Sequence, residues 1–446
     1  MKKLLSVIFL FCMMLSMVSC KGESKTESQE SSAMSQESEV ESQDAEPMED
    51  VSQNSSGFAD IETVEKFGDI LGITQEERLE DYEFLWNTLK DSYLFWGIIE
   101  REGIDIDGIY EEYLSFIEEN QNDADFYVGI NSTLFSLGQS GHLGIIKPDY
   151  YGYFKNVYKG IPNRTQWYET LNNEVSKKNY PKMAQLIKFL GDDEMQSTAG
   201  GGNPDKNVTA FIIPGGEAAY VRINSFAGEI YEKDKEILFD FYDTIGDCQN
   251  LIIDITSNDG GAEMYWMDLI VAPHIDAPLS NDNYALLSMS ENNKPYIKQG
   301  FSDVELHPIA NLPEMPKLND TDKEWATHFY VSNRTVEPSD YRSPFKGEVT
   351  VLTSENVYSS AEAFAIFCKD TAFAKLAGFS TGGDGIGIDP AFVVLPNSGI
   401  IVRYSMSFGL NKDGRSNEEY GTAPDYISDK NESPLATALK VIENGE

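Results

Sequence analysis

From residue 208 onward, short apolar runs alternate with amphipathic helical patterns, and this alternation constrains the fold more than any other feature. Five runs indicate buried strands: Thr209–Ile213, Ala219–Ile223, Leu251–Ile255, Val349–Leu352 and Leu376–Phe379. Helical patterns lie between several of them: Asp234–Asp243, Ala262–Ile270 and Ser360–Lys369. Continuous apolar strands interleaved with helices are typical of a largely parallel or mixed sheet covered by helices. We therefore predict an α/β core over residues 208–446.

The preceding segments have a different texture. Between Thr74 and Phe135, apolar residues recur at spacings of three and four, which predicts three amphipathic helices and a small helical domain over 58–149. Residues 150–207 are rich in Tyr, Lys and Asn and predict a connecting segment or small subdomain, with one helix near Lys182–Leu190. Residues 274–345 could form a lid or an inserted hairpin, and a hairpin is expected where Pro396–Gly399 separates two apolar runs.

The amino terminus predicts export. Lys2 and Lys3 precede an apolar run that ends at the small residue Ser19, as in a secretory signal over 1–19. A membrane-spanning helix is the alternative, but it needs about 20 apolar residues, and this run is shorter. Ser19-Cys20 ends a sequence that looks like a bacterial lipobox, in which the cysteine is acylated. We therefore expect a lipid anchor on Cys20 at the outer face of the cell membrane.

A tether is expected to follow the anchor. Residues 20–57 consist largely of Ser, Glu and Gln, and such a segment cannot bury enough apolar surface to offset chain entropy. We predict a disordered acidic linker that provides reach rather than recognition.

Composition excludes several classes of function. The formal net charge of −40 argues against nucleic-acid binding and against a basic membrane-binding face. Four scattered histidines, and the absence of CxxC, HExxH or EF-hand patterns, predict no metal site. Apart from Cys12 and Cys20, the cysteines are Cys248 and Cys368, for which buried free thiols are expected.

Three stretches could carry chemistry, and each also has a purely structural explanation. Asp254–Gly261 is a glycine-rich turn that could hold negative charge or simply permit positive φ. Ser359 precedes a predicted helix, where the dipole stabilises an oxyanion, but Ser359 and Glu362 also match a capping box. His142 lies in a glycine-rich turn and could be a general base or a structural residue.

In chain order, these stretches resemble the S41 serine peptidases, the tail-processing proteases with their tricorn-core and retinoid-binding-protein-like relatives. The matching stretches are Gly138–Gly144 ("DGHxG"-like), Ala219–Phe226 ("GYIRIxxF"), Asp254–Gly261 ("DLRxNxGG"), Ser359–Glu362 ("SASE"), Gly378–Gly383 ("GExTGG") and Tyr420–Asp425 ("xGIxPD"). The resemblance implies a ClpP/crotonase-like mixed-sheet core and a serine-type endopeptidase that needs no cofactor. No PDZ-like turn is evident in 150–207, which favours the PDZ-less, tricorn-like branch.

The resemblance assigns roles residue by residue. Ser359 matches the nucleophile, and Gly260 matches an oxyanion-hole glycine, with the Ser360 N–H as the second donor. His142 matches the general base of the tricorn-like branch. Glu418, or alternatively Glu419, matches an acidic residue that helps to orient the site.

Two departures leave two hypotheses open. Asp384 stands where the Ser–Lys branch has its basic lysine, and Gly141 stands where the tricorn-like branch has a serine beside the histidine. Asp384 cannot take a proton from serine as a desolvated lysine would. The chain is therefore either a membrane-anchored peptidase that uses His142 and acts on peptides or proteins, or a catalytically inactive peptide-binding lipoprotein on the same fold.

Overall fold

The computed structural model describes residues 69–190, 207–302 and 304–445, and Asp69–Glu446 form one compact unit. The predicted signal, Cys20 and the predicted linker lie outside the described residues. Within the described part of the chain, no helix is long and apolar enough to cross a membrane.

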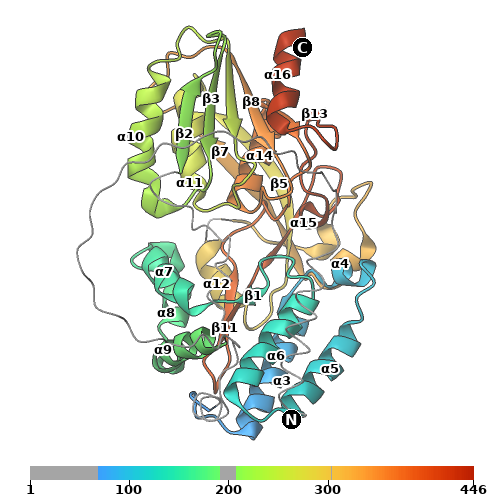
Figure 1. Ribbon diagram of the computed structural model, residues 1–446. Coiled ribbons are helices and arrows are strands. Elements are labelled where there is room, and N and C mark those ends of the chain that lie inside the picture. The colour runs from blue at the N-terminus through green and yellow to red at the C-terminus, as the bar shows by residue number, and fades with distance from the viewer. Residues whose placement is uncertain (1–68, 191–206, 303, 446) are drawn as a thin grey trace, which may run out of the picture. The chain divides into compact units, whose positions relative to one another are not determined.

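The described chain begins with a group of helices (Figure 1). They are α3 (Gln75–Ser92), α4 (Trp96–Arg101), α5 (Ile106–Glu119) and α6 (Asp123–Ser136). Thr74 caps α3 in a capping box with Glu77, which satisfies backbone donors at the start of the helix. The sequence pattern thus gave α3, α5 and α6 correctly, while the short helix α4 was not predicted.

Residues 148–189 are more helical than expected. The structure has α7 (Pro148–Tyr158), the 3₁₀ turn η1 (Pro162–Arg164), α8 (Thr165–Leu171) and α9 (Glu174–Phe189). Tyr and Asn are mediocre helix formers, so propensity alone gave a weak signal. Packing supplies the missing stability, because Tyr158, Trp167 and Leu171 are buried against the strands described below.

A six-stranded sheet forms the α/β core, in the order β13-β9-β8-β4-β3-β2. Its strands are β2 (Val208–Ile212), β3 (Ala218–Ile223), β4 (Asn250–Asp254), β8 (Glu348–Thr353), β9 (Lys375–Gly378) and β13 (Tyr426–Ile427). All pairs are parallel except β2 with β3. The mixed sheet predicted from the apolar runs is confirmed.

Helices cover both faces of this sheet. One face packs against the helical region that comprises η4 (Gly228–Ile230), α10 (Tyr231–Tyr242), α11 (Glu263–Trp266), η5 (Met267–Val271), η6 (Ala272–His274) and α14 (Ser360–Thr371). The other face packs against α16 (Pro434–Asn444). Alternate residues of one strand serve the two faces: Ile253 faces the first set of helices and Ile252 faces α16.

Two further sheets share a core with the amino-terminal helices. One has the order β12-β5-β7-β6 and the other β1-β11-β10. Their strands are β1 (Gly144–Ile145), β5 (Leu279–Leu287), β6 (His307–Pro308), β7 (His328–Val336), β10 (Ala391–Val394), β11 (Ile401–Tyr404) and β12 (Ser407–Leu410). The remaining short elements are α12 (Lys294–Gly300), η7 (Ile309–Asn311), α13 (Asp320–Glu324) and α15 (Asn417–Tyr420).

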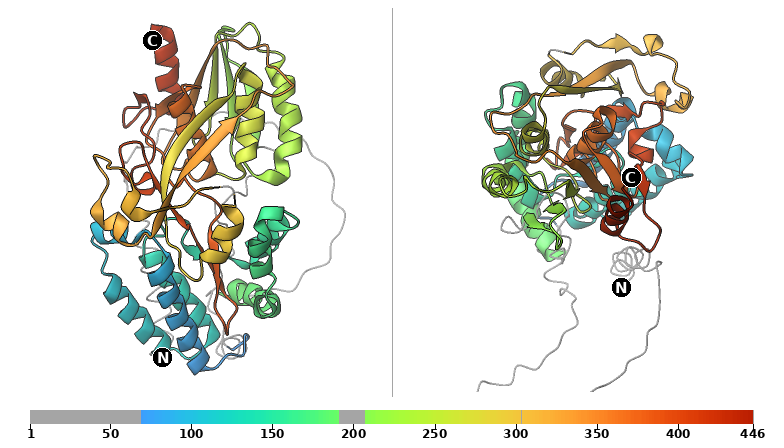
Figure 2. Two further views of the ribbon diagram at one scale, coloured as in Figure 1. Left: turned by 180° about the vertical axis from the view of Figure 1, so that it is seen from behind. Right: turned by 90° about the horizontal axis from the view of Figure 1, so that it is seen from above.

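These sheets bear on two open questions about the sequence. Residues 274–345 contain the long antiparallel pair of β5 and β7, which Figure 2 shows from behind in yellow to orange, with α12, β6, η7 and α13 between the two strands. The pairing is the one that an inserted hairpin would have, but the connection is longer, and the lid stays a prediction. The hairpin expected around Pro396–Gly399 is β10 with β11. The domain boundaries at 149 and 207 stay a prediction, since residues on both sides of residue 149 contribute to one apolar core.

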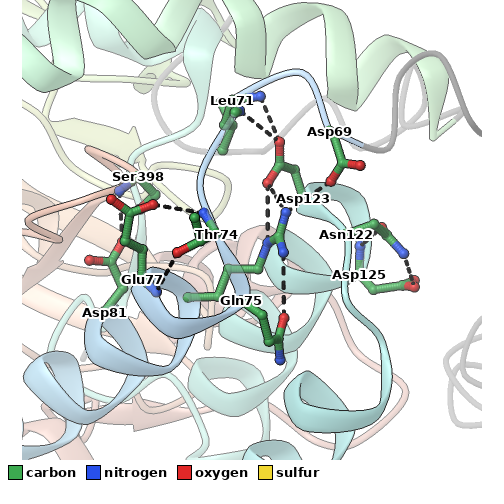
Figure 3. A network of polar contacts seen from close by, with 12 residues as sticks. Asp69, Leu71, Thr74, Gln75, Glu77, Asp81, Asn122, Asp123, Asp125 and Ser398 are labelled. Atoms are coloured by element: carbon green, nitrogen blue, oxygen red, sulfur yellow. Dashed lines mark hydrogen bonds and ion pairs between the residues drawn. The ribbon is translucent and has the colours of Figure 1, made fainter.

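Two buried acids fix the amino-terminal helices (Figure 3). Asp123 joins parts of the helical region, because it pairs with Arg78 at 2.7 Å and accepts the Leu71 N–H at 2.6 Å. Asp81 of α3 accepts the Ser398 N–H at 2.8 Å in the turn between β10 and β11. Burial raises the pKa of the Asp81 carboxyl. The Asp81 contact holds α3 against the turn that leads into strand β11.

Candidate active site

Ser359 lies between β8 and α14 in a sparsely populated backbone conformation, with φ of 54° and ψ of −121°. Positive φ in a non-glycine residue stores strain, and such strain is concentrated at functional sites. The capping-box interpretation is wrong, because the Ser359 side chain makes no capping hydrogen bond to the described helix. Glu362, the other half of the proposed box, is bonded to Asn417 and Thr422 instead. The Ser359 hydroxyl is thus not committed to capping α14.

Gly260 presses against this turn. Its φ is +115°, and a Cβ on it would lie 3.1 Å from the Ser359 Cβ and 3.0 Å from the Ser360 nitrogen. Gly261 has even less room, since its Cβ would lie 2.3 Å from the Phe226 carbonyl oxygen. Glycine is needed here both for the positive φ and for the close approach.

The two predicted oxyanion donors lie together but are not equivalent. The Ser360 N–H belongs to the first turn of α14, where backbone donors have no intrahelical acceptor and the helix dipole favours negative charge. The Gly260 N–H donates to the Asn258 side-chain oxygen at 2.9 Å. Ser360 therefore presents the more open donor, and Gly260 would have to share its donor with Asn258.

His142, which precedes the α/β core in the sequence, also lies beside the Ser359 turn. Its ring stacks on Tyr358, the residue before Ser359, with centroids 5.0 Å apart and planes inclined by 28°. Its backbone φ is +59°, a second strained position beside the Ser359 turn. The helical region thus supplies a histidine to the edge of the α/β core.

Asp384 holds the imidazole. The His142 Nδ1 lies 2.8 Å from the Asp384 Oδ2, within ion-pair distance, although the oxygen lies off the direction of the N–H bond. The same oxygen accepts the Ser405 hydroxyl at 2.6 Å, which fixes the carboxylate. With Nδ1 beside Asp384, Nε2 is the ring nitrogen left for proton exchange with a nucleophile.

The sequence interpretation missed this role of Asp384. It treated the residue as a lost base, because an aspartate replaces the lysine of the Ser–Lys branch. The available signal was position: Asp384 directly follows Thr381-Gly382-Gly383, whose backbone pairs with the turn at Tyr358. A side chain at that position reaches the site whichever residue it is.

Glu418 links the two strained turns. It accepts the Gly141 N–H at 2.9 Å and the Tyr358 hydroxyl at 3.0 and 3.2 Å. Burial, and next the charge of Asp384, raise the pKa of Glu418. Glu418 therefore positions His142 and Ser359 through their neighbours Gly141 and Tyr358. The alternative, Glu419, lies elsewhere and pairs with Arg101 at 2.6 Å.

The presence of glycine at position 141, beside His142, also has a physical explanation. A Cβ on Gly141 would lie 2.5 Å from the Phe95 ring, and the residue has a φ of +59°. A serine, as in the tricorn-like branch, would not fit. The carboxyl of Glu418 provides the support of this turn through the backbone instead.

Glu362 adds a buried acid below the nucleophile turn, and it gives a pH prediction. Burial raises the pKa of Glu362 from 4.5 to about 7. The folded state therefore binds this proton more tightly than the unfolded state. The stabilisation is complete below about pH 4.5 and is lost as the pH rises through about 7. The full effect is on the order of 3 kcal/mol, at about 1.4 kcal/mol per pKa unit.

We expect Glu362→Gln to remove most of this pH dependence. The measurement is urea unfolding of both proteins between pH 5 and pH 8, with the exposed Glu324→Gln as the control. As the pH rises, the natural chain should lose unfolding free energy that Glu362→Gln does not lose, so the variant should become more stable relative to the natural chain. Parallel pH profiles would contradict the assignment.

Neither thiols nor metal ligands add to the site. Cys248 and Cys368 are buried free thiols, as predicted. Among residues 69–190, 207–302 and 304–445, no group of three His, Cys, Asp or Glu side chains is arranged to hold a metal ion.

Two family models match parts of the chain. Residues 217–428 match the peptidase family S41, and residues 74–130 match the tricorn protease C1 domain. The first match contains Ser359, Gly260, Asp384 and Glu418, whereas His142 lies outside both. No curated protein matches the chain in sequence.

Solved structures show the same fold. A candidate peptidase of Parabacteroides merdae has a TM-score of 0.51 at 17% identity, over 83% of this chain and 97% of that one. Mature CPAF in complex with lactacystin has a TM-score of 0.50 at 13% identity, over 83% and 97%. At such identities the likeness concerns the fold alone. The sequence match and the shared order of motifs lead to one conclusion: residues 217–428 belong to peptidase family S41.

Proposed function

We propose that the protein is a serine-type endopeptidase that cleaves peptides or proteins through an acyl-enzyme. The observation that carries this proposal is the strained Ser359 turn beside the pair of His142 and Asp384. A nucleophile, a base and a group that orients the base are the parts that acyl transfer requires.

Each residue has one task in the proposed mechanism. The Ser359 Oγ attacks the scissile carbonyl carbon while His142 Nε2 takes its proton. The N–H groups of Ser360 and Gly260 stabilise the oxyanion of the tetrahedral intermediate. His142 then protonates the leaving amine as the intermediate collapses to an ester on Ser359, which water hydrolyses with His142 again as the base. Asp384 stabilises the imidazolium that forms twice in this cycle.

A fluorophosphonate probe tests the nucleophile directly. Attack by the Ser359 Oγ on phosphorus expels fluoride and leaves a stable phosphonyl ester. We expect mass spectrometry of the labelled protein to locate the adduct on Ser359. Absence of any adduct between pH 6 and 9, on protein shown to be folded, would refute the proposed activity.

The second candidate function is peptide binding without cleavage. The bond from the Gly260 N–H to Asn258 favours it, because a committed donor stabilises an oxyanion less well. Peptide affinity that is unchanged in His142→Ala, combined with no measurable cleavage, would decide for this alternative.

We also propose that the protein is anchored through a lipid on Cys20 at the outer face of the cell membrane. The lipobox-like sequence supports this, and such an anchor confines the enzyme to extracytoplasmic substrates. Cys20→Ser should move the protein from the membrane fraction to the soluble fraction of cells, with Cys248→Ser as the matched control. Retention of Cys20→Ser on the membrane would contradict the anchor.

A further inference from the structure

Arg403 differs from the other arginines in the described part of the chain. Ion pairs with carboxylates hold Arg78, Arg101, Arg164, Arg334 and Arg415. Side-chain or carbonyl oxygens accept hydrogen bonds from Arg222 and Arg342. Within residues 69–190, 207–302 and 304–445, Arg403 alone has neither an ion pair nor a side-chain hydrogen bond. This guanidinium therefore keeps its donors uncommitted.

The surroundings of Arg403 are aromatic and partly buried. Its guanidinium lies over the Phe154 ring of α7, with 5.5 Å between the charge centre and the ring centroid. Burial lowers the pKa of Arg403, and the field of Tyr158, Tyr358, Asp259 and Tyr150 opposes that shift. Asp259 thus acts on Arg403 through its charge. Arg403 is only partly buried, so its guanidinium can exchange bound water for a ligand.

The position of Arg403 connects it with the candidate active site. Arg403 is on β11 and pairs in register with Gly144, two residues after His142. The two groups that feel its charge near the site are Tyr358, which precedes Ser359, and Asp259, which precedes Gly260. The strand register therefore places Arg403 beside the turn that carries His142, and its charge acts on residues next to Ser359 and Gly260.

We propose that Arg403 is a specificity subsite that binds a carboxylate of the peptide substrate. The planar guanidinium can bind a carboxylate through two parallel hydrogen bonds. The Phe154 ring beneath the guanidinium orients it for this contact. The carboxylate comes either from an acidic side chain near the scissile bond or from the carboxyl terminus of the peptide. This inference rests on the proposed peptidase function and adds the class of substrate.

The strongly acidic composition does not oppose this preference. The net charge of −40 acts at long range, and salt at 0.1 M screens interactions between exposed charges beyond about 10 Å. At contact distance, the uncommitted guanidinium dominates. The acidic surface should slow the approach of acidic peptides at low salt without reversing their preference at the site.

Cleavage of matched peptides tests the subsite. One series of quenched fluorogenic peptides varies a single position among Glu, Gln and Lys, and a second compares a free with an amidated carboxyl terminus. The natural chain should prefer one carboxylate-bearing member by about tenfold in kcat/KM, which corresponds to about 1.4 kcal/mol. Arg403→Gln should lose this preference mainly through KM, and Arg403→Lys should keep part of it. The exposed Arg342→Gln is the matched control.

The two peptide series separate the sources of the carboxylate. Preference only in the first series indicates that the carboxylate comes from an acidic side chain. Preference only in the second indicates that it comes from the carboxyl terminus of the peptide. A preference that survives in Arg403→Gln, or no preference in the natural chain, would overturn the inference.

Binding to Ser359→Ala separates this inference from the proposed activity. Fluorescence anisotropy with the same peptides does not require cleavage. Arg403-dependent binding of carboxylate peptides without hydrolysis by the natural chain would refute the activity but retain the subsite. Hydrolysis by the natural chain, without Arg403-dependent binding of carboxylate peptides, would support the activity and refute the subsite.

Discussion

Ser359→Ala is expected to lower peptide hydrolysis by on the order of 10⁶-fold in kcat, as removal of the nucleophile does in other serine peptidases. The reason is that no acyl-enzyme can form without the Ser359 Oγ. Stopped assays with a fluorogenic peptide on the purified full chain measure this loss, and circular dichroism checks that the variant is folded. The change removes one hydroxyl that makes no capping hydrogen bond to α14, so the fold should hardly be affected.

The exposed Ser280→Ala is the matched control for this variant, since its hydroxyl contacts only Thr335 on the neighbouring strand. It should keep the full rate. If Ser359→Ala retained a rate within tenfold of the natural chain, another nucleophile would have to carry the reaction.

Asp384→Asn is expected to lower kcat by about 10⁴-fold, the effect of the same change in a Ser-His-Asp triad. An amide at this position neither stabilises the imidazolium nor enforces the tautomer with the proton on Nδ1. The protein should remain folded, because the Ser405 hydroxyl can still donate to the amide oxygen. Steady-state kinetics across pH 6–9 measure the loss, which should not be restored at high pH.

The exposed Asp282→Asn removes one negative charge outside the site and controls for the overall field. A nearly normal rate in Asp384→Asn would show that the contact of 2.8 Å with His142 is not used in catalysis. Glu418, the buried acid that bonds to Gly141 and Tyr358, would then be the remaining candidate for the orienting carboxyl.

Much of the fold could be predicted because the core obeys simple patterns. Leu251–Ile255 and Val349–Leu352 are apolar on both faces, and only a strand covered by helices on both sides buries them. Helices α7 and α8 escaped prediction, and only the end of α9 was expected, since aromatic packing rather than local propensity stabilises these helices. Tyr151 illustrates this: its ring stacks on Tyr180 of α9 at 3.9 Å, a contact that sequence spacing does not reveal.

The candidate site was predictable in its residues but not in their contacts. Motif order pointed to Ser359, Gly260, His142 and Glu418, and the structure joins all four through neighbouring residues. Motif order could not show that Asp384 lies beside His142, because 242 positions separate the two residues in the sequence and only the tertiary fold brings them together. Nor could it show that Asn258 occupies the Gly260 N–H, which depends on a side-chain rotamer.

The origin of His142 has a consequence for biosynthesis. The histidine comes from the turn after α6, the serine from the turn before α14, and Glu418 from α15 near the end of the described chain. A ribosome-bound or partly translocated chain carries these groups one after another, without the supports that align them. The proposed cleavage therefore requires that nearly all of the described chain has folded, which would withhold activity during synthesis without a separate inhibitor.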